Sequence, residues 1–202
     1  VSNPAMALGA TDIALHDLVP AYGAFANGGQ RVVPQFITSI SDAQGKVLYK
    51  AKKVKTTRAI KEQTAADITA MLQRAVNEGT GASLRSRYGV TGPYAGKTGT
   101  SQGYSDAWFV AYTSNLVIGT WVGAFDPDIH FTSANGTGGQ LALPIVGRVL
   151  KGIEAEPALR KKYVTGFAWM EAVDVAMNCE PRLTTSAVDR FIQKLFRPSR
   201  AD

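Results

Sequence analysis

The sequence has one cysteine, two histidines and no long apolar run. Cys179 has no partner for an internal disulfide. No stretch reaches the roughly 18 apolar residues of a membrane-spanning helix, and the first four residues, Val-Ser-Asn-Pro, do not form a signal peptide. We therefore expect any targeting or anchoring element to lie upstream. The apolar fraction of 45% suits a folded core, and the formal charge of +6 suits anionic partners without selecting one.

The most informative stretch runs from Tyr94 to Tyr112. In it, Lys97 lies among two glycines and three hydroxyl residues, and the residues that follow alternate in the manner of a β-strand. We expect three strands, at about 93–101, 106–113 and 115–124, to form an antiparallel meander with Lys97 on its outer member. A cation and hydroxyl donors on a strand edge form an arrangement suited to holding an anion.

One alternative for Lys97 is a phosphate-binding loop, because Gly-Lys-Thr ends the nucleotide-binding pattern. That pattern requires a glycine five positions before Gly96, where this chain has Thr91. It also requires a helix after the lysine, to direct its N-terminus at the phosphates. The residues after Thr100 predict strand and turn, so the pattern disfavours this alternative.

Six segments stand out in one order over about two thirds of the chain, at residues 7–12, 21–29, 77–81, 96–101, 106–109 and 137–144. Together they resemble the C-terminal half of the transpeptidase domain of class A penicillin-binding proteins, the bifunctional peptidoglycan synthases. Lys-Thr-Gly by itself arises readily by chance, whereas six ordered segments are a specific signal.

The resemblance implies an α+β penicillin-binding fold, an antiparallel sheet flanked by helices, of which this chain is the C-terminal half. It implies that Lys97, Thr98, Gly99, Thr100 and Ser101 bind the carboxylate of a stem peptide ending in D-Ala-D-Ala. Lys97 and the backbone N–H of Thr100, half of an oxyanion hole, would act in catalysis. It further implies acylation by β-lactams, no metal or other cofactor, and a place on the extracytoplasmic (periplasmic) side of the bacterial inner membrane.

The family's nucleophile, the serine of a Ser-x-x-Lys element, is missing, because no serine here is followed by lysine at the third position. Ser133-Ala-Asn135 matches a second element, Ser-x-Asn, but it follows Lys97 instead of preceding it, and we interpret it as coincidence. We therefore expect this chain alone to be inactive. An upstream half of the same domain, in the same or a second chain, is expected to supply the serine and to cover the exposed faces of the sheet.

Residues 1–156 are predicted to belong to the transpeptidase domain, and residues 157–202 to form an appendage of unknown purpose whose last helix, near residues 186–196, docks on the domain. Earlier helices are predicted after a Thr11 cap, from a capping box at Thr64, and over residues 140–152. Pro20 predicts a kink or a restart in the first of them.

Three charged features have simple interpretations. His16 is predicted on the surface. Asp126, Asp128 and His130 alternate as metal ligands can, but without a second histidine nearby they predict a solvated turn. The lysine-rich run of residues 46–61 predicts a solvated loop, with contact to anionic lipid or cell-wall polymer as the alternative. Because this run lacks interleaved aromatic residues, it does not predict nucleic-acid binding.

Two other functions remain open. The chain would be a non-catalytic penicillin-fold module that binds peptide or serves as a scaffold if the upstream half also lacked Ser-x-x-Lys. It would be a basic polyanion-binding module if its binding depended steeply on salt and did not respond to β-lactams.

Overall fold

The computed structural model describes residues 6, 9, 11–126 and 128–170 of the 202. Its centre is an antiparallel sheet of three strands in the order β3 (Ala95–Thr100), β4 (Asp106–Tyr112) and β5 (Val117–Gly123). The predicted meander and the α+β fold class are therefore confirmed. Lys97 lies opposite Val110, and Trp108 lies opposite Trp121. Among the described residues no further strand pairs with β3 or β5, so each leaves one edge open.

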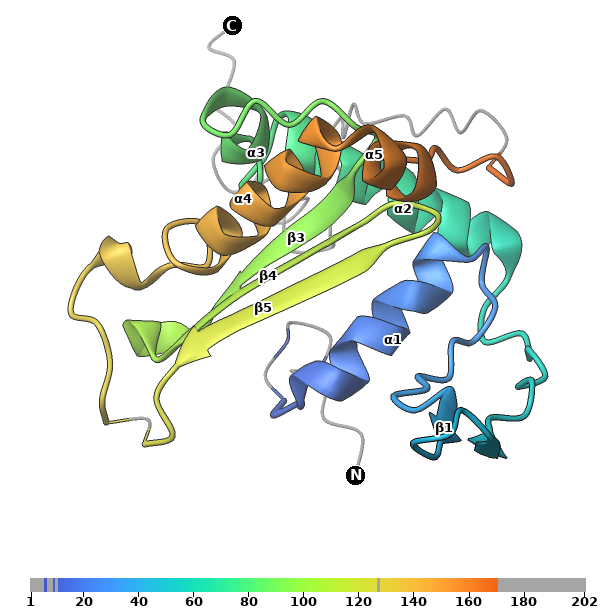
Figure 1. The fold of residues 1–202 in the computed structure, drawn as a ribbon. Coiled ribbons are helices and arrows are strands. Elements are labelled where there is room, and N and C mark those ends of the chain that lie inside the picture. The colour runs from blue at the N-terminus through green and yellow to red at the C-terminus, as the bar shows by residue number, and fades with distance from the viewer. Residues whose placement is uncertain (1–5, 7–8, 10, 127, 171–202) are drawn as a thin grey trace, which may run out of the picture.

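The core lies on both faces of the central strand. The sequence of β4, Asp-Ala-Trp-Phe-Val-Ala-Tyr, is apolar in consecutive positions, as a strand covered on both sides requires. Phe109 belongs to a cluster with helix α4 (Ala142–Ala155). Tyr112 packs with helix α1 (Leu15–Ala26), and its hydroxyl shares a hydrogen bond of 3.0 Å with Thr69 of helix α2 (Glu62–Asn77). Figure 1 shows these helices on the two sides of the sheet.

Helix α4 packs closely because its buried residues recur at helical spacing. Ala142, Leu143, Val146, Gly147 and Leu150 face the core. At Gly147 an added Cβ would lie only 2.7 Å from the ring of Tyr88, so only glycine permits this approach. The short helix α5 (Pro157–Tyr163) follows at once and packs against α4.

A second, smaller sheet projects from this body. Strands β1 (Ser39–Ser41) and β2 (Val47–Lys50) form an antiparallel hairpin. Asp42 holds its turn by accepting hydrogen bonds from the backbone N–H groups of Gln44 (3.1 Å) and Lys46 (2.8 Å). Every side chain of the two strands is exposed.

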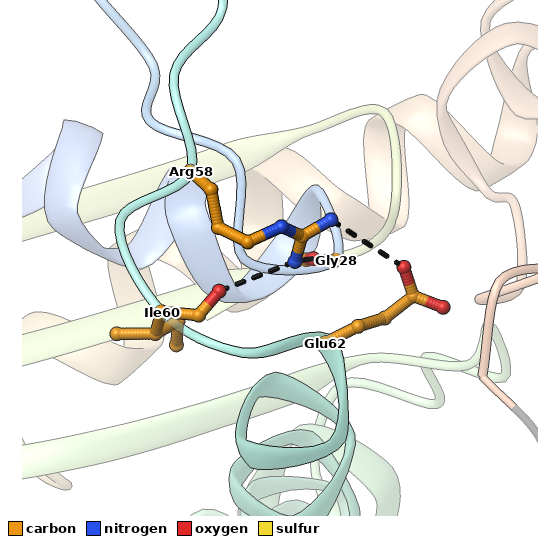
Figure 2. Close-up of polar contacts among 4 residues, drawn as sticks. All are labelled: Gly28, Arg58, Ile60 and Glu62. Atoms are coloured by element: carbon orange, nitrogen blue, oxygen red, sulfur yellow. Dashed lines mark hydrogen bonds and ion pairs between the residues drawn. The ribbon is translucent and has the colours of Figure 1, made fainter.

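The base of the hairpin is joined to the body by Arg58. Its guanidinium donates hydrogen bonds of 3.2 Å to the carbonyls of Gly28 and Ile60, and it pairs with the Glu62 carboxylate at 3.8 Å. Figure 2 shows this arrangement between the end of α1 and the start of α2. The backbone of Arg31 adds a hydrogen bond of 2.7 Å to the carbonyl of Thr57. The two chain ends of the hairpin are thus held together.

Several local predictions are wrong. Helix α2 begins at Glu62 after Lys61, so Thr64 is already helical and cannot act as its cap. Helix α1 begins at Leu15 after Ala14 instead of at a Thr11 cap, and it continues through Pro20 without a restart. The connection between α2 and β3 contains the short helix α3 (Ser83–Ser86).

Residues beyond the predicted domain boundary also contact the body. The backbone carbonyl of Tyr163 accepts a hydrogen bond of 2.6 Å from Thr113, and Phe167 packs on Tyr112 with ring centroids 5.7 Å apart. Cys179 and the predicted helix near residues 186–196 lie outside the described residues. No helix in the described part of the chain has both the length and the apolar character needed to cross a membrane.

Candidate active site on strand β3

The predicted site residues lie together at the end of β3. Lys97 and Thr100 are exposed, while Thr98, Gly99 and Ser101 are half-buried. Lys97 donates a hydrogen bond of 2.9 Å from Nζ to the carbonyl of Thr98, and among the described residues it forms no ion pair. Its positive charge is therefore available to an anion that approaches the open edge of the sheet.

The two threonine hydroxyls of the strand have different partners. Thr98 donates through Oγ1 to the Oγ1 of Thr80, 2.7 Å away, in the turn that follows α2. Thr100 instead accepts, at 3.0 Å, the backbone N–H of Gly138, from the loop that precedes α4. Neither partner was assigned a role from the sequence, although both lie within the segments 77–81 and 137–144 that carry the family resemblance.

Gly138 fits its position because it has no side chain. An added Cβ would collide with the backbone carbonyl oxygens of Trp108 and Gly99. The next glycine, Gly139, has room, since a Cβ there would meet only the Thr80 carbonyl at 3.8 Å. The loop therefore lies directly against β3 at one residue, and that contact positions the Thr100 hydroxyl.

Ser101 holds the turn between β3 and β4. Its hydroxyl accepts the backbone N–H of Asp106 at 2.8 Å and shares a hydrogen bond of 2.8 Å with Ser105. The Asp106 carboxylate accepts hydrogen bonds from the Trp121 indole (2.8 Å) and the Ser105 hydroxyl (2.9 Å). Burial tends to raise the pKa of Asp106, but hydrogen bonds from Trp121, Ser105 and Ser101 outweigh burial and lower it. The carboxylate stays charged and keeps the turn closed.

The other end of β3 is held by Glu154 of α4. Its carboxylate accepts hydrogen bonds from the N–H groups of Thr91 (3.0 Å) and Gly92 (2.7 Å), and from the Thr91 hydroxyl at 3.1 Å. Burial opposes the charge on Glu154, but these hydrogen bonds lower its pKa below the usual value. Arg85 donates to the carbonyls of Val90 (2.9 Å) and Gly92 (2.7 Å).

This network argues against the phosphate-loop alternative. The N–H groups of Thr91 and Gly92, which would have to face a phosphate, instead bind the Glu154 carboxylate. The residues after Lys97 continue as strand β3, so no helix begins there. The loop before Lys97 is an internal support for the strand.

The remaining candidate residues lie in local turns. His16 is exposed beside Asp17, at 3.4 Å. Asp126 accepts the backbone N–H of Asp128 at 3.0 Å, and His130 lies 2.9 Å from the carbonyl of Phe131. Ser133 accepts the N–H of Asn135 and so starts a short 3₁₀ turn, which gives the Ser-x-Asn match a structural role.

The sequence model of the penicillin-binding protein transpeptidase domain matches residues 2–151. This chain belongs to that family. Penicillin-binding protein 1A of Rickettsia bellii is 32% identical over 194 residues, an alignment that covers 85% of this chain and 24% of the relative. Penicillin-binding protein 1A of Neisseria flavescens is 33% identical over 162 residues, an alignment that covers 75% of this chain and 20% of the relative. The chain therefore spans about a quarter or less of these relatives and is a fragment of a transpeptidase domain.

Solved structures support the same fold. Penicillin-binding protein 1A of Haemophilus influenzae superimposes with a TM-score of 0.68 at 22% identity, over 78% of this chain and 29% of that one. PonA1 of Mycobacterium tuberculosis superimposes with a TM-score of 0.66 at 27% identity, over 85% of this chain and 45% of that one. Penicillin-binding protein A of M. tuberculosis, solved as an imipenem acyl-enzyme, gives 0.55 at 25% identity, over 71% and 32%.

Proposed function

We propose that this chain supplies the substrate-binding strand of a peptidoglycan D,D-transpeptidase that works through a serine acyl-enzyme. The observation that carries the proposal is Lys97, an exposed cation without an acidic partner among the described residues, on a strand whose outer edge is open. A stem peptide ending in D-Ala-D-Ala offers a terminal carboxylate to Lys97. It also offers an extended backbone that can add to the free edge of β3.

In this proposal the chemistry is divided between two segments. A serine hydroxyl from the upstream half attacks the carbonyl of the penultimate D-Ala, the peptide C–N bond breaks, and the last D-Ala leaves with a proton. The acyl group then passes to an amine of a neighbouring stem peptide. The backbone N–H of Thr100 donates to the oxyanion that forms in each step, and one such donor is worth about 10²–10³ in rate.

Two observations support an upstream partner segment. No serine of this chain begins a Ser-x-x-Lys element. Strand β5 pairs only with β4 in the described residues, and most of its side chains are half-buried, so its outer edge is suited to accept another strand. The chain by itself is then inactive, and the complete protein holds it at the extracytoplasmic side of the inner membrane through an upstream anchor.

β-Lactams are proposed as inhibitors that acylate the same serine. Penicillin-binding protein A of M. tuberculosis, which shares this fold, is solved as an imipenem acyl-enzyme. A β-lactam carries a carboxylate beside its reactive amide, so Lys97 and Thr100 are suited to both ligands.

The test is intact-mass measurement after treatment with penicillin, on the full-length protein and on this chain alone. We expect one penicilloyl adduct on the full-length protein and none on this chain. An adduct on this chain alone, or none on a folded full-length protein, would contradict the proposal. The second result would favour the non-catalytic peptide-binding module, which the lack of Ser-x-x-Lys here also allows.

A further inference from the structure

The positive charge of this chain is concentrated in the hairpin and in the two segments that join it to the body, residues 30–61, here called the basic arm. These residues include eight lysine and arginine residues and one acidic residue, Asp42, which gives a formal charge of +7. The whole chain has a formal charge of +6, so the remaining residues together carry −1. A polyanion that approaches the chain is therefore attracted chiefly to the basic arm.

The cations of the basic arm are available to a partner. All eight residues are exposed, and among the described residues only one of them, Arg58, forms an ion pair, with Glu62. Asp42 does not neutralise them, because its carboxylate accepts the backbone N–H groups of the hairpin turn. Figure 1 shows the hairpin projecting from the body beside α1, away from the end of β3. The basic arm is thus separate from the site on β3.

A cleft at the base of the basic arm adds a shaped contact to this charge. It has a volume of about 290 Å³ and lies between the end of α1 and the two chain segments of the arm. Arg31 and Lys55 line it together with the Asn27 amide and the apolar side chains of Val32 and Val54. Two cations in one cleft can hold a carboxylate, and the amide and apolar groups suit the adjoining parts of a peptide or sugar.

The distribution of apolar side chains argues against a membrane as the partner. Side chains alternate between the two faces of a strand, so Val47 and Tyr49 of β2 lie on one face and Leu48 on the other, all of them exposed. A segment that lies on a lipid bilayer needs its apolar side chains on one face. The lysines instead follow one another along residues 50–55, the segment that leaves β2, which suits a polymer with several anionic groups.

We propose that the basic arm is a second binding surface for the peptidoglycan strand, apart from the site on β3. In the proposed function each stem peptide ends in a carboxylate, so a glycan strand that carries many stem peptides is a polyanion. One carboxylate binds in the cleft between Arg31 and Lys55, and others bind along the lysines of residues 50–55. Holding the polymer there raises the effective concentration of further stem peptides at Lys97. The inference rests on the proposed function, which supplies the polymer.

The experiment measures sedimentation of the full-length protein with purified, insoluble peptidoglycan after treatment of the protein with penicillin. The treatment occupies the site on β3, so the binding that remains reports the basic arm. The arm variant replaces four exposed lysines by glutamine: Lys50, Lys52, Lys53 and Lys55. The matched control removes the same charge from four exposed residues of α4 and α5, also by glutamine: Arg148, Lys151, Lys161 and Lys162.

We expect the arm variant to raise the Kd for peptidoglycan about tenfold, the combined effect of four exposed charge contacts. The control variant should leave it within about twofold of wild type. Raising the salt from about 0.1 M to about 1 M shortens the screening length from about 10 Å to about 3 Å and should remove the difference between the variants. Equal losses in the two variants, or no loss in the arm variant, would overturn the proposal.

A second measurement needs no variant. Peptidoglycan whose carboxylates have been converted to amides should bind the wild type as weakly as unmodified peptidoglycan binds the arm variant. Undiminished binding of the amidated polymer would overturn the proposal, because the basic arm would then not recognise carboxylates.

Two further controls separate the alternatives. Vesicles of phosphatidylcholine and phosphatidylglycerol present the other anionic surface. An arm variant that lost binding to these vesicles but kept its binding to peptidoglycan would overturn the proposal in favour of a lipid surface. A folded wild type that is never acylated by penicillin would contradict the proposed catalytic function instead, and the comparison of the two variants on peptidoglycan would continue to test the basic arm.

Discussion

The hairpin β1–β2 and the sheet β3–β5 are both antiparallel, yet they differ in what surrounds them. Every side chain of the hairpin strands is exposed, and its base is held by Arg58. Strand β3 is held at its start by Glu154, at its end by Ser101 and from one side by Gly138. A two-stranded hairpin without a covered face is marginally stable in water. Rigidity is thus concentrated where Lys97 must meet its ligand.

Among the substitutions that test this difference between the hairpin and the sheet, Gly138→Ala is expected to destabilise the protein most. The new methyl group would collide with the carbonyl oxygens of Trp108 and Gly99, which belong to paired strands and cannot move aside. We expect a loss of about 3 kcal/mol in the free energy of unfolding, measured by urea denaturation. Gly139→Ala is the matched control, because its methyl group has room. Similar losses for the two variants would contradict the close approach at Gly138.

Glu154→Gln should cause the next largest loss in the free energy of unfolding, and the size of that loss should depend on pH. The folded-state pKa of Glu154 lies below its unfolded value, so the carboxylate stabilises the fold fully above the unfolded pKa of about 4.3. That contribution is lost as the pH falls toward the folded pKa. At pH 7 we expect a loss of about 2 kcal/mol.

The difference in the free energy of unfolding between wild type and Glu154→Gln should therefore become smaller on acidification. Urea denaturation from pH 7 to pH 3 measures it. Glu156→Ala serves as the control, because the exposed side chain of Glu156 makes no hydrogen bond or ion pair to the described residues. A constant difference over the whole range would show that Glu154 acts by packing and not by charge.

Arg58→Met should loosen the hairpin with little effect on the sheet. The substitution removes two hydrogen bonds to carbonyls and the ion pair with Glu62, while it keeps an apolar side chain of similar length. We expect a loss of about 1 kcal/mol or less in the free energy of global unfolding. Amide hydrogen exchange over residues 47–50 should nevertheless become faster. Lys55→Met is the control on the exposed run. Faster exchange in β4 as well would show that the two regions are not independent.

The sequence allowed the sheet to be predicted because its signals are local. Residues 107–112 of β4 are apolar in succession and include three aromatic residues and a valine, and Lys97 lies in a recognisable segment. The supports of β3 from Thr80, Gly138 and Glu154 were not predicted, because each joins positions far apart in the chain. Thr80 and Thr98 are 18 residues apart, Thr100 and Gly138 are 38, and Gly92 and Glu154 are 62. No periodicity connects such pairs; only the packed fold brings them together.

The capping box at Thr64 is a different case, because here a local signal was present but did not set the start of the helix. Thr64 and Asp67 have the spacing of a cap, but the helix begins at Glu62. Burial of Ala65, Ala66 and Thr69 against the sheet decides where the helix lies. Because packing contributes more than one cap of about 1 kcal/mol, the helix extends past its local start signal.

The central claim is that Lys97 serves a ligand and not the fold. The most direct measurement is the acylation rate of full-length Lys97→Ala by penicillin, together with its unfolding free energy and with Lys151→Ala, an exposed lysine of α4, as control. We predict at least about tenfold slower acylation for Lys97→Ala, with stability unchanged within about 0.5 kcal/mol. Acylation at the wild-type rate, or a loss of stability that accounts for the slower rate, would contradict it.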